Sequence, residues 1–526
     1  NERIAPMLSL LYKITPRTTL QLTGELIIND ANPSNTDAPV INAFDEDGSG
    51  RAFFFPVEDN WYGGFTNDFS EDLTQVYQAS LRHEFLDNLN VTANFSWNRS
   101  ERESGAGGYF SFAGPDNTFG SGAVNPEDGN VNRLVFDQAR YVQAWAGNID
   151  INYNISTGPI EHKIILGASY TGIETENTNG FSPLVPPGFV TEMPATNLFN
   201  PVYVEFNHLT DFQSSPPFNI QLWEEKEYGF YVQDLISLRN TGLKAMLGLR
   251  FNDYDFETLS SSNWAGEEGF FFPAIANTSV VPRVGLLYEF APALSTYVSF
   301  SQSIVPIAPF NVDGTITEED PKPITGEQWE VGFKGVLADK LTYTLALYQL
   351  DRQNVVVAVT PMTSAQDGLR RSRGIELDIS GSFFERQNLY FSYGYTGTEI
   401  VESGVDDALE GERFNGVPEH FLSLWNTYQL ANRLGFGVGV EHRSSWVIQP
   451  GSFGSTVPVE EDGYFIVNAS LFYDIPMKKG KLDANFTINN IFDDYYFLPT
   501  ENTLFVKRGA PVGFTFSVGY RFGANP

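Results

Sequence analysis

The sequence has no cysteine, only five histidines and five methionines, and no long apolar run. The lack of cysteine excludes a disulfide framework and any metal site built on thiolates. No window approaches the roughly 18 to 20 consecutive apolar residues of a transmembrane helix, and helical periodicity is nowhere sustained. A membrane protein with this sequence would therefore have to cross the bilayer with β-strands.

Signals of catalysis are also missing. The histidines are scattered along the chain, none lies in an HExxH motif, and no nucleophile elbow is present. We therefore predict that the protein is not an enzyme and needs no cofactor. A hydrolase site assembled from Ser and His side chains on neighbouring strands is an alternative that sequence spacing leaves open. The five histidines of the chain are His83, His162, His208, His420 and His442.

Positive charge is scarce: 32 Lys and Arg stand against 65 Asp and Glu, which gives a formal net charge of −33. Binding to nucleic-acid phosphates requires a basic surface, so the charge argues against a nucleic-acid partner. The acidic balance is equally consistent with loops that are simply solubilised by charge. For a ligand, it mildly favours a neutral or cationic complex over a strongly anionic one.

What the chain has in abundance is Phe, Tyr and Gly, at 44, 24 and 47 residues. The segment Gly513–Phe522 reads GFTFSVGYRF, with a large apolar residue at every second position. This period is typical of a strand with one face toward an apolar medium and one toward a polar medium. The composition and this pattern predict an all-β protein.

About 19 segments of this kind can be counted, from one near Arg3 to Gly513–Phe522, and the connections between them are alternately short and long. Outer-membrane barrels have short periplasmic turns and long extracellular loops, so this alternation predicts a transmembrane antiparallel β-barrel. The first strand would run toward the periplasm. Because bacterial barrels have an even strand count and begin in the periplasm, an odd number of strands, one or three, would precede residue 1.

Several stretches resemble the TonB-dependent siderophore receptors of Gram-negative outer membranes, and the ferrichrome-type group most of all. They follow one another in the family's order and cover nearly the whole chain: "RIAPMLSLLYKITPRTTLQLTGEL" (Arg3–Leu26), "VPRVGLLYEF" (Val281–Phe290), "PKPITGEQWEVGFKG" (Pro321–Gly335), "LTYTLALYQLDRQNV" (Leu341–Val355), "RRSRGIELDISG" (Arg370–Gly381), "GVPEHFLSLWNTY" (Gly416–Tyr428) and "NNIFDDYYF" (Asn489–Phe497).

The resemblance implies a 22-stranded barrel, of which residues 1–526 would be an N-terminally incomplete barrel domain. It further implies that a plug domain and a TonB-binding box, both absent from this sequence, belong in front of it. The family's function would be TonB-dependent import of a ferric siderophore across the outer membrane by a monomer. The acidic balance mildly favours a hydroxamate siderophore over a trianionic catecholate. The implied partners are the ferric siderophore, TonB with ExbB and ExbD, the barrel assembly machinery and lipopolysaccharide.

Ligand contacts in such receptors come from aromatic and polar side chains at the extracellular end. An aromatic ring buries a large area at low entropic cost, and a Tyr hydroxyl or Trp indole adds a directional hydrogen bond. For each aromatic candidate, packing within the loop or a place in the aromatic belt is the alternative. For the arginines, pairing with acidic loops or lipopolysaccharide phosphates is the alternative. The candidates are Trp61, Tyr62, Phe110, Phe112, Trp264, Phe271, Phe310, Trp446, Arg370 and Arg373.

Two further sites are suggested by short motifs. Asp45, Asp47 and Ser49 resemble the opening of an EF-hand-type calcium loop, but Pro56 stands where a bidentate Glu belongs, so a solvated turn is the favoured interpretation. The resemblance to the family also implies that Val518, Tyr520 and Phe522 form the signal for the barrel assembly machinery, although Gly-Ala-Asn-Pro follows them.

Three other functions remain open. A passive diffusion porin would need neither plug nor TonB, but porins usually have 16 to 18 strands. A receptor for haem, cobalamin or another metal chelate would differ only in its ligand contacts. A surface adhesin or phage-docking scaffold would be a secondary use of the loops.

Overall fold

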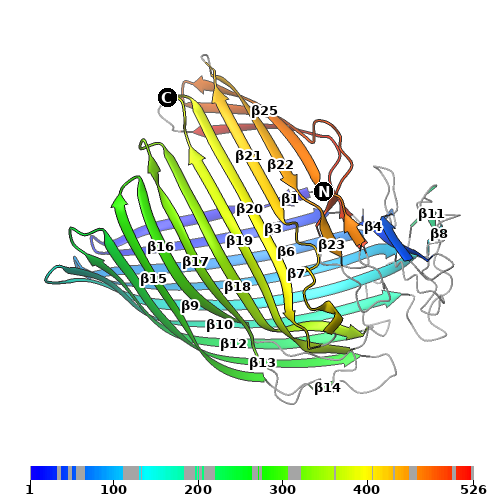
Figure 1. The fold of residues 1–526 in the computed structure, drawn as a ribbon, viewed down its shortest axis with the longest axis horizontal. Helices are drawn as coiled ribbons and strands as arrows, with labels where there is room; N and C mark the ends of the chain where they lie inside the picture. The colour runs from blue at the N-terminus through cyan, green and yellow to red at the C-terminus, as the bar shows by residue number, and fades with distance from the viewer. Residues whose placement is uncertain are drawn as a thin grey trace.

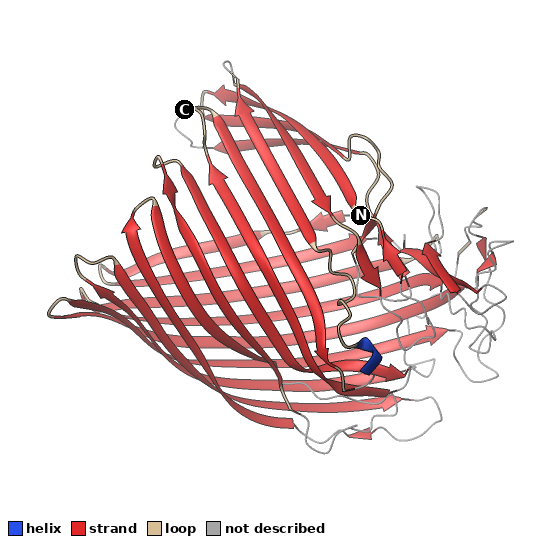
Figure 2. Cartoon of the chain, in the orientation of Figure 1, coloured by secondary structure: helices blue, strands red, loops and turns tan. Residues whose placement is uncertain are grey.

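The computed structural model describes most of the strands and part of the connections between them. The described residues are 2–31, 37–44, 50–54, 66–109, 130–131, 133–182, 196–197, 200, 204–205, 219–262, 270–271, 275–305, 322–360, 363–404, 407–430, 433–448, 459–499 and 505–522. Apart from a 3-10 turn at Asp407–Leu409, these residues form strands, turns and irregular segments (Figure 2). None of the described segments is an apolar helix of membrane-spanning length.

One antiparallel sheet of 21 strands dominates the structure. Two of these strands are short continuations, since β1 (Glu2–Ile4) lies beside β3 in line with β2, and β14 (Phe270–Phe271) lies beside β13 in line with β15. The full strands are β2 (Met7–Thr15), β3 (Thr18–Ala31), β6 (Phe69–Leu86), β7 (Leu89–Tyr109), β9 (Arg133–Thr157), β10 (Ile160–Ser182), β12 (Asn219–Leu238), β13 (Leu243–Ser262), β15 (Ile275–Ala291), β16 (Leu294–Val305), β17 (Ile324–Leu337), β18 (Leu341–Thr360), β19 (Thr363–Gly381), β20 (Gln387–Glu402), β21 (His420–Gln429), β22 (Leu434–Arg443), β25 (Tyr464–Met477), β26 (Gly480–Asn489) and β29 (Gly513–Phe522).

Each full strand pairs with the next full strand along the chain, and the sheet curls strongly (Figure 1). Tight turns connect the strands at one end, along the left of Figure 1, and we call this the turn end. The strand ends joined by the long connections lie at the opposite end, which we call the loop end. The strand count and the alternation of short and long connections expected from the sequence are confirmed.

The two faces of the sheet differ in polarity because side chains alternate along each strand. Directly paired residues share a face, and one row of them reads Leu166, Val232 and Leu249 on β10, β12 and β13. All three are exposed, as are large apolar residues along most of this side. The neighbouring row, one residue along, reads Gly167, Tyr231 and Arg250. We call these sides the apolar face and the polar face.

The closed barrel expected from the sequence is not formed by the described residues. The edge strands β2 and β29 have no pairing with each other, and nearly every residue in them is exposed. Strands alternate in direction across an antiparallel sheet, so these first and last full strands run the same way. They therefore cannot become direct antiparallel neighbours.

Small sheets lie at the loop end, where the sequence predicted connections only. A four-stranded sheet joins β27 (Phe497–Leu498), β28 (Phe505–Arg508), β4 (Asp37–Phe44) and β5 (Gly50–Phe54). Its β28–β4 pairing links the connection after β3 to the connection before β29, from opposite ends of the large sheet. Two further pairs join β23 (Trp446–Ile448) to β24 (Val459–Glu461) and β8 (Asn130–Val131) to β11 (Thr196–Asn197).

Candidate functional site

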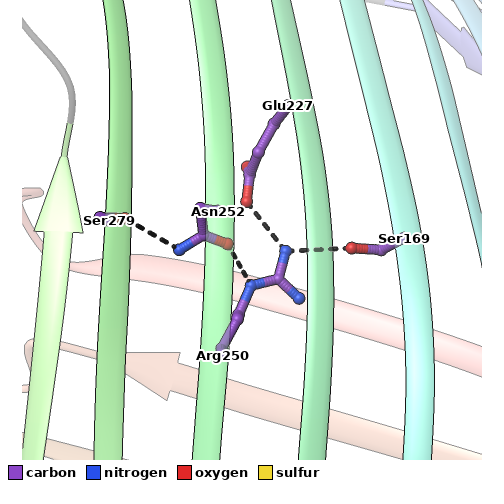
Figure 3. Close-up of polar contacts among 5 residues, drawn as sticks. All are labelled: Ser169, Glu227, Arg250, Asn252 and Ser279. Atoms are coloured by element: carbon purple, nitrogen blue, oxygen red, sulfur yellow. Dashed lines mark hydrogen bonds and ion pairs between the residues drawn. The ribbon is translucent and has the colours of Figure 1, made fainter.

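A hydrogen-bonded network crosses the polar face around Arg250 of β13 (Figure 3). The Arg250 Nη2 atom donates to Glu227 Oε1 at 2.9 Å and to Ser169 Oγ at 3.0 Å. Its Nε atom donates to Asn252 Oδ1 at 2.5 Å, and the Asn252 amide donates to Ser279 Oγ at 3.4 Å. The Arg250 guanidinium thus joins side chains from β10, β12 and β13, and Asn252 extends the network to β15.

The network continues toward the first strands through Tyr231 of β12. The guanidinium of Arg250 lies 5.4 Å from the centre of the Tyr231 ring, and the Tyr231 hydroxyl donates to Asp150. Asn148 donates to Asp150 at 2.6 Å and Asn94 donates to Asn148 at 3.3 Å. We call the set that runs from Asn94 to Ser279 the polar belt.

Two glycines explain how these long side chains lie flat on the sheet. Gly167 is the register neighbour of Tyr231, and a Cβ atom there would come within 2.3 Å of the tyrosine ring. At Gly229 a Cβ atom would come within 2.2 Å of the Arg250 guanidinium. Because both positions are glycine, Tyr231 and Arg250 cover the backbone of the neighbouring strand and project less from the wall.

Beside the polar belt, the polar face has a hollow of about 490 Å³. Its lining is mostly hydroxyl and amide side chains from β3, β6, β7, β9 and β10, among them Gln21, Gln78, Ser80, Asn94 and Ser169. Such a wall can exchange hydrogen bonds with a polar molecule or a polar protein segment. On the apolar face, β9, β10, β12 and β13 form a groove of about 480 Å³, lined by residues such as Leu166, Phe230 and Phe251.

The two candidate arginines do not form one site, because they lie on opposite faces of β19. Arg373 shares its face with the exposed Ile375, and its Nε donates to Gln349 at 3.0 Å. Arg370 shares the opposite face with Glu376 and lies 5.8 Å from the centre of the Phe414 ring. An odd spacing of three residues along a strand always separates two side chains in this way. Their contacts to a ligand stay predictions.

Trp446 lies in β23 rather than in an irregular loop, and its side chain is fully buried with 0% exposed. Its indole nitrogen has no hydrogen-bond partner among the described residues. Directly opposite in the pairing is Glu461 of β24. Burial, together with the charge of Asp462, raises the pKa of Glu461 to about 7. Contact between Trp446 and a ligand stays a prediction and would require the β23–β24 hairpin to move.

The motif NNIFDDYYF (Asn489–Phe497), one of the stretches that carry the family resemblance, begins at the last residue of β26. In the structure its Asn490 side chain, 2% exposed, donates to the carbonyls of Asp494 and Ala510 and accepts from the Asp494 amide. The Tyr496 ring packs 4.6 Å from that of Tyr464, and the Arg508 guanidinium lies 4.3 Å from the Tyr495 ring. The motif therefore folds the connection after β26 into a tight, aromatic-covered turn.

The remaining site predictions divide into those outside the described residues and those on the sheet. Phe271 is placed in β14, paired with Leu259. Val518, Tyr520 and Phe522 share the apolar face of the edge strand β29, and Phe522 is 83% exposed. Trp61, Tyr62, Phe110, Phe112, Trp264, Phe310 and the calcium candidates Asp45, Asp47 and Ser49 lie outside the described residues. Elsewhere in the described chain, no group of three or more acidic or histidine side chains is arranged to hold a metal ion.

The polar belt was missed by the sequence reasoning, which looked for ligand contacts only at the loop end. A signal was available: in LKAMLGLRFNDYDF the residues alternating with Leu247, Leu249 and Phe251 include Arg250 and Asn252. A charged residue on the polar side of a strand marks a position that needs a partner. The partner of such a residue depends on the register between neighbouring strands, and the sequence alone does not give that register.

Comparisons with known proteins give one consistent picture. The family model described as TonB dependent receptor-like, beta-barrel matches residues 9–491. The ferrichrome outer membrane transporter/phage receptor of Escherichia coli K12 is 27% identical over 478 residues, which are 88% of this chain and 60% of that protein. The ferrioxamine receptor of Yersinia enterocolitica is 24% identical over 530 residues, 99% of this chain and 68% of that protein.

Solved structures share the fold. The ferric-catecholate import receptor Fiu of E. coli K12 in its closed form superposes with a TM-score of 0.79 at 19% identity, covering 98% of this chain and 74% of that one. The siderophore receptor PiuA of Acinetobacter baumannii gives 0.78 at 18% identity, with the same coverage. This chain spans about 60% of the length of the ferrichrome transporter.

Proposed function

Because the chain belongs to the TonB-dependent receptor-like β-barrel family, we propose that it is the barrel part of an outer-membrane receptor that binds and imports a ferric siderophore. Import would draw on TonB with ExbB and ExbD, acting through a plug domain that fills the barrel. We further propose a hydroxamate-type siderophore, because the acidic chain favours a neutral or cationic complex over a trianionic one.

The observation that carries this proposal is the two-sided sheet. Leu249 and Arg250 are adjacent in β13, yet one is exposed on an apolar face and the other anchors the polar belt. Lipid on the apolar face and an aqueous or protein-filled lumen on the polar face account for both. In this arrangement the polar belt would line the lumen and meet the plug, and the loop end would face the outside.

Closure of the sheet forms part of the proposal. The edge strands β2 and β29 run the same way, so an odd number of further antiparallel strands is needed between them. Three would complete the 22 strands of the family type.

The test is a titration of the full-length protein with a ferric trihydroxamate and a ferric catecholate, followed by quenching of tryptophan fluorescence. We expect quenching at nanomolar concentrations of the hydroxamate and at least tenfold weaker binding of the catecholate. Equal binding of both would contradict the hydroxamate preference, and binding of neither would contradict the siderophore receptor.

A passive porin is the main alternative, and haem or cobalamin are alternative ligands. Single-channel conductance in a planar bilayer distinguishes the porin, because a steadily open pore is incompatible with a plugged receptor. The same quenching assay with haem and cobalamin tests the other ligands.

A further inference from the structure

The tight turns between the later strands carry exposed cations without acidic partners. They occur in four turns, which join β17 to β18, β19 to β20, β21 to β22 and β25 to β26. Although Asp339 and Glu385 stand in two of these turns, no acidic side chain of the described residues forms an ion pair with any of the cations. The cations are Lys340, Arg386, Arg433, Lys478 and Lys479.

The turns between the earlier strands differ, because their cations are paired with acids. Arg239 contacts Glu161 at 2.7 Å, and Arg17 contacts Asp87 at 3.0 Å, each joining two neighbouring turns. One residue inside the strands the two groups do not differ, because Lys244 contacts Glu289 at 2.9 Å and Lys481, after the β25–β26 turn, contacts Asp474 at 3.0 Å. The earlier turns therefore use their cations to hold the turns together, whereas the later turns leave theirs available.

Two of the available cations occupy strained backbone positions. Arg386 has φ 67° and Arg433 has φ 73°. These values lie in the left-handed region, which L-residues with long side chains rarely adopt. The earlier turns have Gly158, Asn240 and Gly242 at such positions, residues that tolerate this conformation. Such a turn does not require arginine, because Ala338 and Asp339 adopt positive φ between β17 and β18.

Each of the four turns also exposes a large apolar residue near its cation. Phe384, the largest of these, is 70% exposed two residues before Arg386, and Leu434 is exposed directly after Arg433. Leu337 is exposed three residues before Lys340, and Met477 is exposed directly before Lys478. An apolar group adjoining a cation suits the boundary between acyl chains and headgroups, where the charge reaches water and the apolar part stays in lipid.

We propose that these four turns form a docking rim for the anionic phospholipid headgroups of the membrane leaflet at the turn end. The proposal rests on the membrane placement given under Proposed function. A lipid surface fits better than an acidic protein, because the cations follow the edge of the sheet turn by turn beside exposed apolar residues. A protein partner would call for a compact patch with a buried apolar centre.

The test compares lipid preference in nanodiscs that contain the full-length protein. The probe is phosphatidylglycerol in a phosphatidylcholine background at low ionic strength, and the readout is the ratio of the two lipids retained on the protein by native mass spectrometry. Each cation near an anionic surface contributes about 1 kcal/mol, so the double variant Arg386→Asn/Arg433→Asn should lower the preference for phosphatidylglycerol about 30-fold.

A second readout separates this role from a structural one. In pure phosphatidylcholine the double variant should resist unfolding by urea at least as well as the parent, because Asn tolerates positive φ better than Arg. The matched control Arg17→Asn/Arg239→Asn removes paired cations and should leave the lipid preference unchanged. If the Asn variant fails to fold, Arg386→Lys/Arg433→Lys keeps both charges and should keep the preference.

An unchanged lipid preference in the Asn variant would overturn the proposal. So would a parent protein that does not distinguish the two lipids, an outcome that would favour an acidic soluble protein as the occupant of the rim. Siderophore binding measured in the same nanodiscs keeps the two proposals apart. A protein that prefers phosphatidylglycerol but binds no siderophore would contradict the receptor function alone.

Discussion

Leu249 and Arg250 are neighbours in β13, and they belong to two different environments. Leu249 is 49% exposed in a row of exposed apolar side chains, whereas Arg250 contacts three polar side chains on the other face. The exposed side chains of the apolar face depend on the medium around them, although some pack on one another, as Tyr228 does on Tyr170 with ring centres 5.1 Å apart. On the polar face the side chains depend on specific partners. The surrounding medium therefore stabilises one face of the sheet. Pairs of side chains, which the strand register brings together, stabilise the other face.

The largest effect should come from placing a charge on the apolar face. Leu249→Arg should lower the free energy of unfolding in a bilayer by up to about 4 kcal/mol, because a guanidinium that faces hydrocarbon loses its hydration. Met246→Arg lies on the polar face of the same strand and is the matched control. Urea unfolding in lipid vesicles measures both, and equal losses would mean that the two faces do not differ in environment.

Removing the cation of the polar belt should have a smaller effect. Arg250→Met leaves Glu227 without its guanidinium partner and should cost about 2 kcal/mol, as expected for lost hydrogen bonds between charged groups. The loss stays below that of a deeply buried ion pair because both side chains are about one third exposed.

Adding Glu227→Gln to Arg250→Met sharpens this result. The double variant carries no uncompensated charge, so it should recover part of the lost stability in the same unfolding assay. If the second substitution lowers stability as much as it does in the parent background, Glu227 and Arg250 do not interact energetically.

The smallest effect should come from a single hydroxyl. Tyr231→Phe removes the bond to Asp150 on the polar face and should cost about 1 kcal/mol. Tyr228→Phe removes a hydroxyl from the apolar face of the same strand, where the described residues offer it no hydrogen-bond partner, and should be nearly neutral. The difference between the two unfolding midpoints measures how far the polar face depends on specific pairs.

Much of the fold could be predicted from alternation alone. Gly513–Phe522 was identified as a strand from its sequence and is β29 with the same bounds. The short connections were equally readable, because turn residues such as Gly158 interrupt the pattern at the turn end. Local sequence suffices here because a side-chain period of two follows from backbone geometry.

The candidate site could be predicted less well. Arg370 and Arg373 were grouped by their closeness in sequence, but a strand places them on opposite faces. Trp446 was predicted to lie in a loop, yet it is buried in the β23–β24 hairpin. The residues around it show no alternating pattern long enough to predict these short strands. Arg250 was overlooked because its partners Glu227 and Ser169 lie 23 and 81 residues away in sequence.

The sequence by itself determined the strands, their two-sidedness and the alternation of short and long connections, because each of these is set by residues close together in the chain. The tertiary structure decided the register, and with it the polar belt, the glycines beneath Tyr231 and Arg250, and the β28–β4 link across the two ends of the sheet. It also decided that the cations of the later turns have no acidic partner among the described residues. These features join residues that are distant in sequence, and only the folded sheet brings them within reach of one another.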